Sequence, residues 1–247
     1  PDAIYISMSM HGQTGPQASF LGYGLTMGAV TGLHNLCGYP DLEPAGTGTN
    51  FPDHVPNPTH APFAILAALR YRRKTGRGQS IDLAQIEPTI AVLGPAVLDF
   101  TVNGRVAERV GNQHLSGAPH GVYPARGDDR WVAISATGSQ PWHELLTVLD
   151  IPELALDPRF ASETARWQYR SELDAALASH TALHDAGELS QKLQARGVSA
   201  GPVQDAEDVL YRDEQLIARK HWAYLDHPEM GRTVYSAFPF HLSRTPG

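Results

Sequence analysis

The feature that most constrains the fold is a long helical segment between two strand-like segments in the first half of the chain. Thr59 is predicted to cap this helix, and Pro62 is tolerated because a first turn needs no intrahelical N–H donor. Residues 63–69 are apolar nearly all round, which predicts a buried helix. Basic residues at 70–74 complement the negative end of the helix dipole, and Gly76 ends the helix.

The segments on either side of this helix favour strands. Residues 4–10 alternate apolar and small polar side chains, and residues 80–84 form a short strand that leads into the apolar stretch 86–102. A strand, a helix and a second strand in this order predict a parallel α/β layer. Residues 20–36, apolar and rich in glycine, predict a helix packed closely against the sheet.

The second half of the chain has a different pattern, after a polar, glycine-rich stretch at 103–119 that is typical of a linker. It predicts a smaller α+β domain. Its expected elements are a hairpin with strands at 121–123 and 131–134 around the turn 126–129, helices at 140–150, 170–181, 185–197 and 211–220, and a strand-like tail at 233–242.

Composition excludes several classes of function. The net charge of -7 comes from scattered residues, whereas a nucleic-acid surface needs clustered positive charge. The one cysteine, Cys37, allows neither an internal disulfide nor a multi-cysteine metal site, and it fits a reducing cytoplasm. No apolar run is long enough to span a membrane. The twelve histidines show no metal-binding spacing, so no metal is expected.

One candidate for chemistry lies in the long Gly- and Pro-rich loop predicted at 38–58. Asp53 stands near the end of this loop, just ahead of the buried helix. An aspartate there can simply favour a turn, or it can act as a nucleophilic carboxylate near the positive end of the helix. The residues alone leave both interpretations open.

Six segments in order along the chain nevertheless resemble one known family. They are IYISMSMHGQTGP at 4–16, LGYG at 21–24, AILAALRYRRKTGRGQSIDLAQ at 64–85, APHGVYPARGDDRWVAI at 118–134, DPRFAS at 157–162 and GVSAGPVQDAEDVL at 197–210. Together they resemble the class III CoA-transferases, the group of formyl-CoA and carnitine-CoA transferases.

The resemblance implies a Rossmann-like large domain, incomplete here, joined to a smaller α+β domain in an interlocked homodimer. Residues 1–102 would belong to the large domain, 103–117 to a linker, 118–226 to the small domain and 227–247 to a segment returning to the large domain. The resemblance also implies that the N-terminal part and the C-terminal end of the family fold are missing. The N-terminal part carries contacts to the CoA nucleotide in the family.

The implied activity is transfer of CoA from an acyl-CoA donor to a carboxylic acid through a covalent aspartyl intermediate. The family nucleophile maps onto Asp53, Tyr23 onto a tyrosine near the thioester, and Gln85 onto a contact to the pantetheine arm. Two features depart from the family. Asn57 stands where many members have glycine, and the run from Asp53 to Thr75 is one residue longer.

The same resemblance implies acyl-CoA as a substrate and no permanently bound cofactor, and it leaves alternatives open. The chain could belong to the racemase branch of the family, to a non-catalytic subunit of a two-chain enzyme, or to a fragment that folds without activity. In the racemase branch, a histidine stands where this chain has Tyr23. The donor and acceptor acids are not defined by the sequence.

Overall fold

The structure is a computed structural model that describes residues 1–245. The chain divides into two compact units, one of residues 1–115 and one that begins at Ser116. The predicted mixture of helices and small sheets is confirmed, and each unit is described by itself below.

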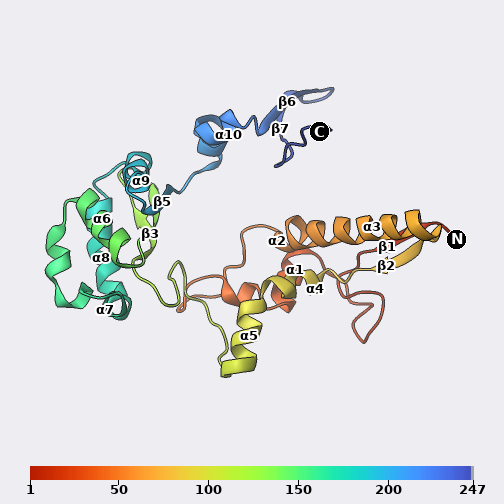
Figure 1. The fold of residues 1–247 in the computed structure, drawn as a ribbon, viewed down its shortest axis with the longest axis horizontal. Helices are drawn as coiled ribbons and strands as arrows, with labels where there is room; N and C mark the ends of the chain where they lie inside the picture. Colours follow the sequence, from red (N-terminus) through yellow and green to blue (C-terminus); the bar gives the residue numbers. More distant parts are fainter. Residues whose placement is uncertain (246–247) are drawn as a thin grey trace. The chain divides into compact units, whose positions relative to one another are not determined.

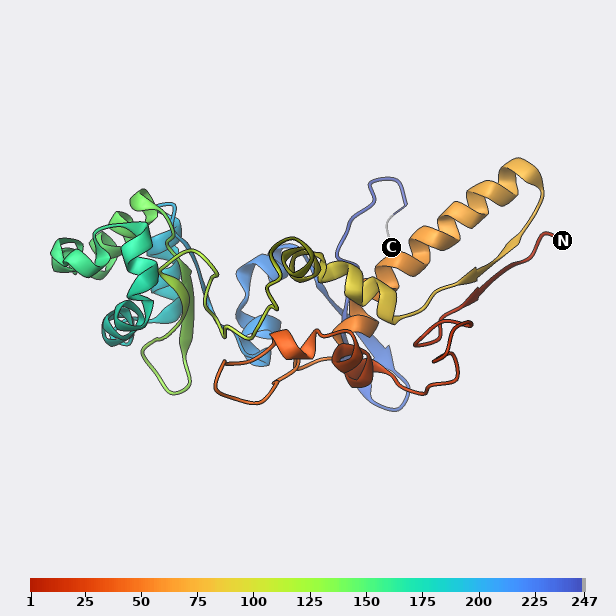
Figure 2. The ribbon, with the colours of Figure 1, turned by 90° about the horizontal axis from the view of Figure 1, so that it is seen from below.

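The first unit is built on a strand–helix–strand motif. Strand β1 (Ile4–Ser7) pairs in parallel with β2 (Gln79–Asp82), so that Ile4 lies opposite Gln79 and Ser7 opposite Asp82. Helix α3 (Pro56–Thr75) runs beside both strands in the two views (Figures 1 and 2). The parallel pairing predicted from the sequence is therefore confirmed.

Four shorter helices complete this unit. A single 3₁₀ turn over His34–Leu36 follows the first of them. The helices are α1 (Gly24–Val30), α2 (Phe51–His54), α4 (Ile86–Val92) and α5 (Gly94–Asn103). The predicted helix over 20–36 is therefore shorter than expected, and the predicted loop over 38–58 contains α2 and the start of α3.

The start of α3 was predicted wrongly. The helix begins at Pro56, three residues before the expected cap Thr59. Prolines look like helix breakers, but a residue in the first turn needs no N–H donor, so Pro56 and Pro58 are tolerated there. The Thr59 hydroxyl instead donates to the carbonyls of Val55 and Pro56, each at 2.9 Å. The predicted C-terminal end of the helix is confirmed, because Gly76 follows its last residue with a left-handed φ of 70°.

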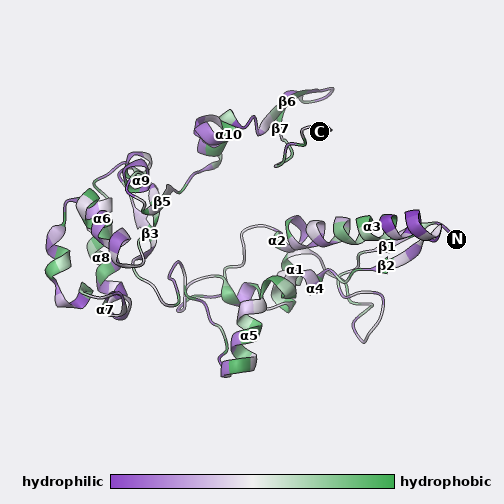
Figure 3. Cartoon of the chain, in the orientation of Figure 1, coloured by the Kyte–Doolittle hydropathy of each residue, from purple (hydrophilic) through white to green (hydrophobic). Residues whose placement is uncertain are grey.

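The predicted burial of α3 is only partly correct. Figure 3 shows its middle as hydrophobic and its last turns as hydrophilic. Two side chains of the apolar middle are largely exposed, Phe63 at 76% and Leu66 at 63%. A sheet of two strands covers one flank of a helix, so the opposite flank stays open. The buried apolar side chains of this unit are Met10, Met27, Leu33, Ala61, Ala68 and Ala84.

The second unit contains a three-stranded antiparallel sheet. Strand β4 (Trp131–Ser135) lies between β3 (His120–Pro124) and β5 (Ser199–Pro202). The β3–β4 hairpin pairs Tyr123 with Val132, and it confirms the hairpin predicted around the turn 126–129. Strand β5 was not predicted, because Ser-Ala-Gly-Pro carries none of the usual strand residues.

The second unit also contains helices, and most of them were predicted. Asp185 caps α9 by accepting the N–H groups of Gly187 and Glu188, each at 3.0 Å, as its spacing predicted. The helices are α6 (Ser139–Leu149), α7 (Glu163–Gln168), α8 (Arg170–Thr181), α9 (Ala186–Gln194) and α10 (Glu214–Ala218).

One connected hydrophobic core fills the space between this sheet and its helices. Val132 and Ile134 of β4 pack with apolar side chains from three helices. The helical residues that are nearly or completely buried are Trp142, Leu145 and Leu149 of α6, Leu173 and Leu177 of α8, and Leu189 and Leu193 of α9. The predicted α+β character of this unit is thus confirmed by its packing as well as by its elements.

The segment after β5 contributes no buried residue to that core. It forms a π-helical turn at Asp208–Arg212, helix α10, and an antiparallel hairpin of β6 (Trp222–His227) and β7 (Gly231–Ser236). The continuous helix predicted over 211–220 is replaced by the π-helical turn and α10. The strand predicted over 233–242 ends at Ser236.

Candidate active site

The candidate nucleophile Asp53 lies on α2, a single helical turn inside the expected loop. Asn50 immediately precedes this turn, and its carbonyl accepts the backbone N–H of Asp53 at 2.9 Å. The half-buried Asp53 carboxylate accepts the backbone N–H of Gly24 on its Oδ2 atom at 3.1 Å. Among the described residues its Oδ1 atom has no hydrogen-bond partner. One oxygen is therefore held by the protein and the other is open for chemistry.

Gly24 is suited to its role as a donor because no other residue fits its place. Its φ of +27° is a backbone conformation that L side chains rarely adopt. A β-carbon built on Gly24 would also lie 2.4 Å from the side chain of Asn50. The start of α1 can therefore approach α2 closely enough to form the hydrogen bond to Asp53.

Tyr23 directly precedes Gly24, the residue that donates to the Asp53 carboxylate. Its backbone is extended (φ −157°, ψ 172°), and its side chain is 75% exposed. Tyr23 remains open to a ligand.

Gln85 reaches the same region only indirectly. Its backbone N–H donates to Ser9 O at 3.0 Å, and the next residue, Ile86, donates to Met10 O at 3.1 Å. The Met10 side chain in turn lies against Gly22, where a β-carbon would meet its sulfur at 2.4 Å. Among the described residues no hydrogen bond joins the Gln85 side chain to Asp53 or Tyr23.

Two histidines near α1 could in principle act with Asp53, but both are engaged elsewhere. The His11 ring packs edge-on against Phe20, with ring centroids 5.8 Å apart. The His34 ring packs against Gly28, where a β-carbon would lie 2.2 Å from its Nε2 atom. No contact between either ring and Asp53 is observed in the described part of the chain.

No role near Asp53 was predicted for three residues: Gly24, Asn50 and the buried Asn57. Gly24 lies in the LGYG segment, and Asn57 stood out only as a departure from the family pattern. The roles of the two asparagines depend on how α2 joins α3, and that junction was predicted as loop.

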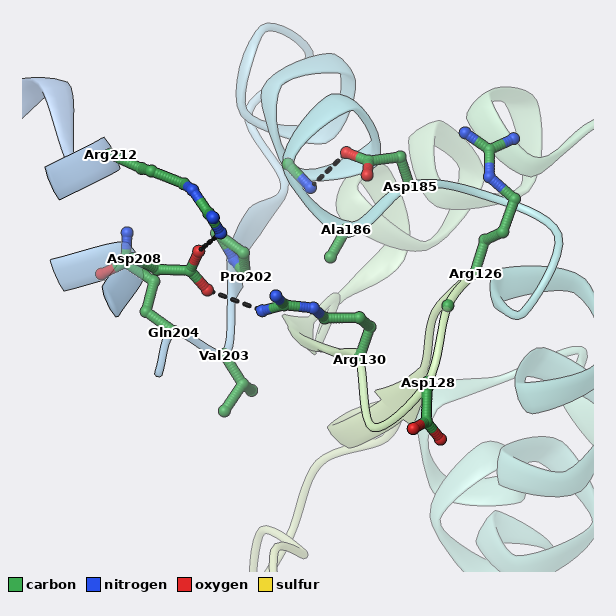
Figure 4. Close-up of a pocket in the computed structure, with 12 residues that line it drawn as sticks. Arg126, Asp128, Arg130, Asp185, Ala186, Pro202, Val203, Gln204, Asp208 and Arg212 are labelled. Carbon is green, nitrogen blue, oxygen red and sulfur yellow. Dashed lines mark hydrogen bonds and ion pairs between the residues drawn. The ribbon is translucent and has the colours of Figure 1, made fainter. Parts of the chain in front are cut away.

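The second unit contains a pocket of about 490 Å³, shown in Figure 4. Arg130 and Arg212 approach it from opposite sides, and both bind Asp208, at 2.7 Å and 2.8 Å. A hydrogen bond from Arg212 lowers the pKa of Asp208, and a hydrogen bond from Arg130 lowers it by a smaller amount. Arg130, Arg212 and Asp208 are thus paired with one another, whereas Arg126 and Asp128 also line the pocket.

Within residues 1–245 no three histidine, cysteine or acidic side chains gather closely enough to hold a metal ion. Over the same residues, none of the helices combines the length and the apolar character that a membrane crossing requires.

Comparison with known proteins connects this geometry to a family. Residues 1–247 match CoA-transferase family III over their whole length. The chain is 32% identical over 247 residues to succinyl-CoA–D-citramalate CoA-transferase of Chloroflexus aurantiacus, covering all of this chain and 61% of that protein. It is 29% identical over 248 residues to the alpha subunit of succinyl-CoA–L-malate CoA-transferase from Chloroflexus aurantiacus, covering 57% of that subunit.

A solved structure agrees with this assignment. The chain superposes on a CaiB/BaiF family protein from Brucella suis with a TM-score of 0.88 and 32% identity, covering all of this chain and 63% of that one. The chain thus spans about three fifths of the length of these relatives. With a match over its full length and a shared fold, the chain belongs to CoA-transferase family III.

Proposed function

We propose that the full-length protein containing this chain transfers CoA from an acyl-CoA to a carboxylic acid, with Asp53 as the covalent carrier. The observation that carries this proposal is the Asp53 carboxylate itself. It is half-buried, one oxygen is held by Gly24 N–H at 3.1 Å, and the other has no partner among the described residues. A nucleophilic carboxylate needs this combination of fixed orientation and an open oxygen.

The chemistry divides the exchange into similar steps. Asp53 Oδ1 attacks the acyl carbonyl carbon, the C–S bond breaks, and a mixed anhydride and CoA thiolate form. The thiolate then attacks the Asp53 carbonyl carbon, which releases the donor acid and leaves an aspartyl-CoA thioester. The acceptor carboxylate repeats these two steps in reverse order and leaves with CoA.

The protein would stabilise the oxyanions of these steps with fixed donors. The Gly24 N–H already points at Asp53 Oδ2, which becomes the carbonyl oxygen of the thioester. A donor in place before the reaction stabilises the developing charge without reorganisation. By the resemblance to the family, Tyr23, exposed beside Gly24, would contact the thioester end of CoA, and Gln85 would contact the pantetheine arm.

Substitution of Asp53 tests the proposal. In the full-length protein, Asp53→Asn should lower turnover at least about 1,000-fold, because an amide cannot form the anhydride. Succinyl-CoA is the first donor to use, since the names of both Chloroflexus relatives contain it. The control is Asp41→Asn, an exposed carboxylate in the preceding loop, which should retain turnover.

Chemical trapping identifies the carrier directly. Hydroxylamine added with an acyl-CoA donor should inactivate the wild type and convert Asp53 to a hydroxamate, detected by mass spectrometry of its peptide. Retention of normal turnover by Asp53→Asn, or a hydroxamate on another residue, would remove Asp53 from this role.

The racemase alternative predicts a different exchange. A racemase needs two groups near neutral pKa, one to take the α-proton and one to return a proton on the opposite face. Position 23 is tyrosine, whose ordinary pKa is about 10, and the His11 and His34 rings pack elsewhere. We therefore expect CoA exchange between acids without incorporation of deuterium from the solvent into a 2-methylacyl-CoA. Rapid incorporation in the absence of an acceptor acid would favour the racemase.

Assembly is the second part of the proposal. We expect two copies of the full-length chain to form a homodimer, and the exposed apolar side chains of the first unit support this. They include Phe63, Leu66, Leu98 and Phe100, all more than half exposed. Light scattering on the purified full-length protein should give a dimer. A stable dimer that appears only with a second, different chain would support the two-chain alternative.

A further inference from the structure

Asn57, the second residue of α3, is buried without hydrogen bonds. Its side chain is 1% exposed, and neither its Nδ2 nor its Oδ1 atom has a partner among the described residues. A buried amide whose hydrogen bonds are unmade destabilises a fold, so an apolar residue of similar size would pack better there. The presence of an asparagine at position 57 is therefore not explained by stability, and another reason is needed.

The spacing along the chain gives that reason. Asn57 follows Asp53 by four residues, which places two side chains on the same side of a helix. Val55 interrupts the regular dihedral angles between α2 and α3 (φ −122°, ψ −72°). Backbone hydrogen bonds lead into and out of this break, from Val55 N to Phe51 O and from Thr59 N to Val55 O. The buried amide therefore follows the candidate nucleophile by four residues, across a break between two helices that contact each other.

The hydrogen-bonding capacities of the two side chains are complementary. A carboxylate can accept about four hydrogen bonds, whereas Asp53 accepts one, from Gly24 N–H on Oδ2. The Asn57 amide has two N–H donors and uses neither. A change in the side-chain conformation of Asn57 would offer this unused donor to the Asp53 carboxylate.

We propose that Asn57 supplies the second donor to Asp53 Oδ2 during turnover, so that Gly24 N–H and Asn57 Nδ2 together form the oxyanion hole of the aspartyl intermediate. When the CoA thiolate attacks the Asp53 carbonyl carbon, the negative charge develops on Oδ2. It returns to the carbonyl as the bond to Oδ1 breaks and the donor acid leaves. The inference rests on the proposed function, because it requires Asp53 to be the carrier.

The test uses Asn57→Leu and Asn57→Ala in the full-length enzyme, with succinyl-CoA as donor. Asn57→Leu should raise the urea midpoint of unfolding, because it removes a buried amide without partners. It should also slow hydroxylamine trapping of Asp53 about 100-fold, the effect of deleting one oxyanion donor, with the KM for the donor nearly unchanged. The control is Asn112→Leu, an exposed asparagine of the same unit, which should trap at the wild-type rate.

A pH profile separates this role from a structural one. Because Asn57 donates to Asp53 only during turnover, its loss disfavours the charged carboxylate of the substrate-bound enzyme, so the acidic limb of kcat should move to higher pH in Asn57→Ala. The titratable groups on the elements around Asp53 are Tyr23 before α1, His54 on α2, Glu87 on α4, and His60 with the basic and tyrosine side chains at 70–74 on α3. None of them is changed by the substitution, so the shift reports on Asp53.

Each outcome decides the inference. Slow trapping with a shifted acidic limb supports it, and trapping at the wild-type rate by Asn57→Ala overturns it. If Asn57→Leu does not fold, the Ala variant alone gives the decision. A wild-type pH profile in Asn57→Ala together with inactive Asp53→Asn overturns this inference and leaves the proposed function intact, whereas active Asp53→Asn removes the proposed function itself.

Discussion

The two units of this chain differ in how completely they bury their apolar side chains and in how completely their buried polar atoms are hydrogen-bonded. In the unit that begins at Ser116, one connected core runs from Ala118 to Val198, and large side chains such as Trp142 and Phe160 are almost completely buried. In residues 1–115 half of the buried apolar side chains are alanines, while Phe63, Leu66 and Phe100 stay exposed. The first unit therefore forms its strand–helix–strand motif but has an incomplete hydrophobic core.

The polar groups follow the same division. In the described part of the chain, every buried side-chain N or O atom without a partner belongs to the first unit, on His11, His34 or Asn57. The second unit instead satisfies even its buried Arg166. Unmade hydrogen bonds tend to occur where function or a further partner requires them. This division agrees with the proposed function, in which the first unit carries the nucleophile and the second unit has the more complete core.

The largest expected effect is a difference in autonomy between the units. Residues 116–247 produced alone should unfold cooperatively on heating, because their core closes within the fragment. Residues 1–115 alone should show no cooperative transition, because too little apolar surface is buried to offset chain entropy. Circular dichroism during heating and dispersion of amide resonances measure both.

The chain of residues 1–247 serves as the control for that experiment. It should show the transition of the isolated second unit at nearly the same temperature. Cooperative unfolding of residues 1–115 alone would contradict the division of roles, as would the absence of a transition in residues 116–247.

A second prediction concerns the buried charge that organises the second unit. Arg166 is 2% exposed and donates to three backbone carbonyls, those of Ala118 at 3.1 Å, Phe160 at 3.4 Å and Gly138 at 3.0 Å. Arg166→Met leaves these carbonyls without a partner and should lower the free energy of unfolding by about 3 to 4 kcal/mol. Urea titration of residues 116–247 measures the change.

Arg159 offers a matched control for this substitution. It forms an exposed ion pair with Asp157 at 2.6 Å. Arg159→Met should change stability by less than about 1 kcal/mol, as is usual for surface pairs. Equal losses in the two variants would mean that the carbonyl network around Arg166 adds nothing to the stability of the unit.

Much of the fold could be predicted because its signals are local. The hairpin around residues 126–129, the cap at Asp185 and the helix end at Gly76 depend on a few adjacent residues. The start of α3 could not be predicted, because a proline breaks the interior of a helix but is tolerated in its first turn, where Pro56 and Pro58 lie. Strand β5 is held by its pairing with β4 rather than by strand-forming residues, so only tertiary structure reveals it.

The resemblance and the position in the chain proposed Asp53 as the nucleophile, and this stays a prediction. The hydrogen bond that Asp53 accepts could not be predicted, because its donor Gly24 lies 29 residues away in sequence. That contact depends on the absence of a β-carbon at Gly24, against which Asn50 packs. Asn57 appeared only as a departure from the family pattern, and its lack of partners is a property of three-dimensional packing. No periodicity in the sequence encodes either fact.

The smallest expected effect concerns a part-buried hydrogen bond of the second unit, between a tyrosine hydroxyl and a carboxylate. Tyr123, 2% exposed, donates its hydroxyl to Asp174 Oδ1 at 2.7 Å. Burial raises the pKa of Asp174 despite this hydrogen bond, so the folded state binds a proton more readily than the unfolded chain. The stability that this proton contributes is present at low pH and is lost as pH rises through the folded pKa.

Asp174→Asn keeps an oxygen acceptor for Tyr123 and removes the charge. It should therefore raise the free energy of unfolding at pH 7 by less than about 1 kcal/mol, because solvent screens the partly exposed carboxylate, and by nothing near pH 3, at about which the wild-type carboxyl is already protonated. Urea titrations of both proteins at the two pH values measure the difference, and a variant less stable at pH 7 would show that the charged hydrogen bond outweighs the cost of burial.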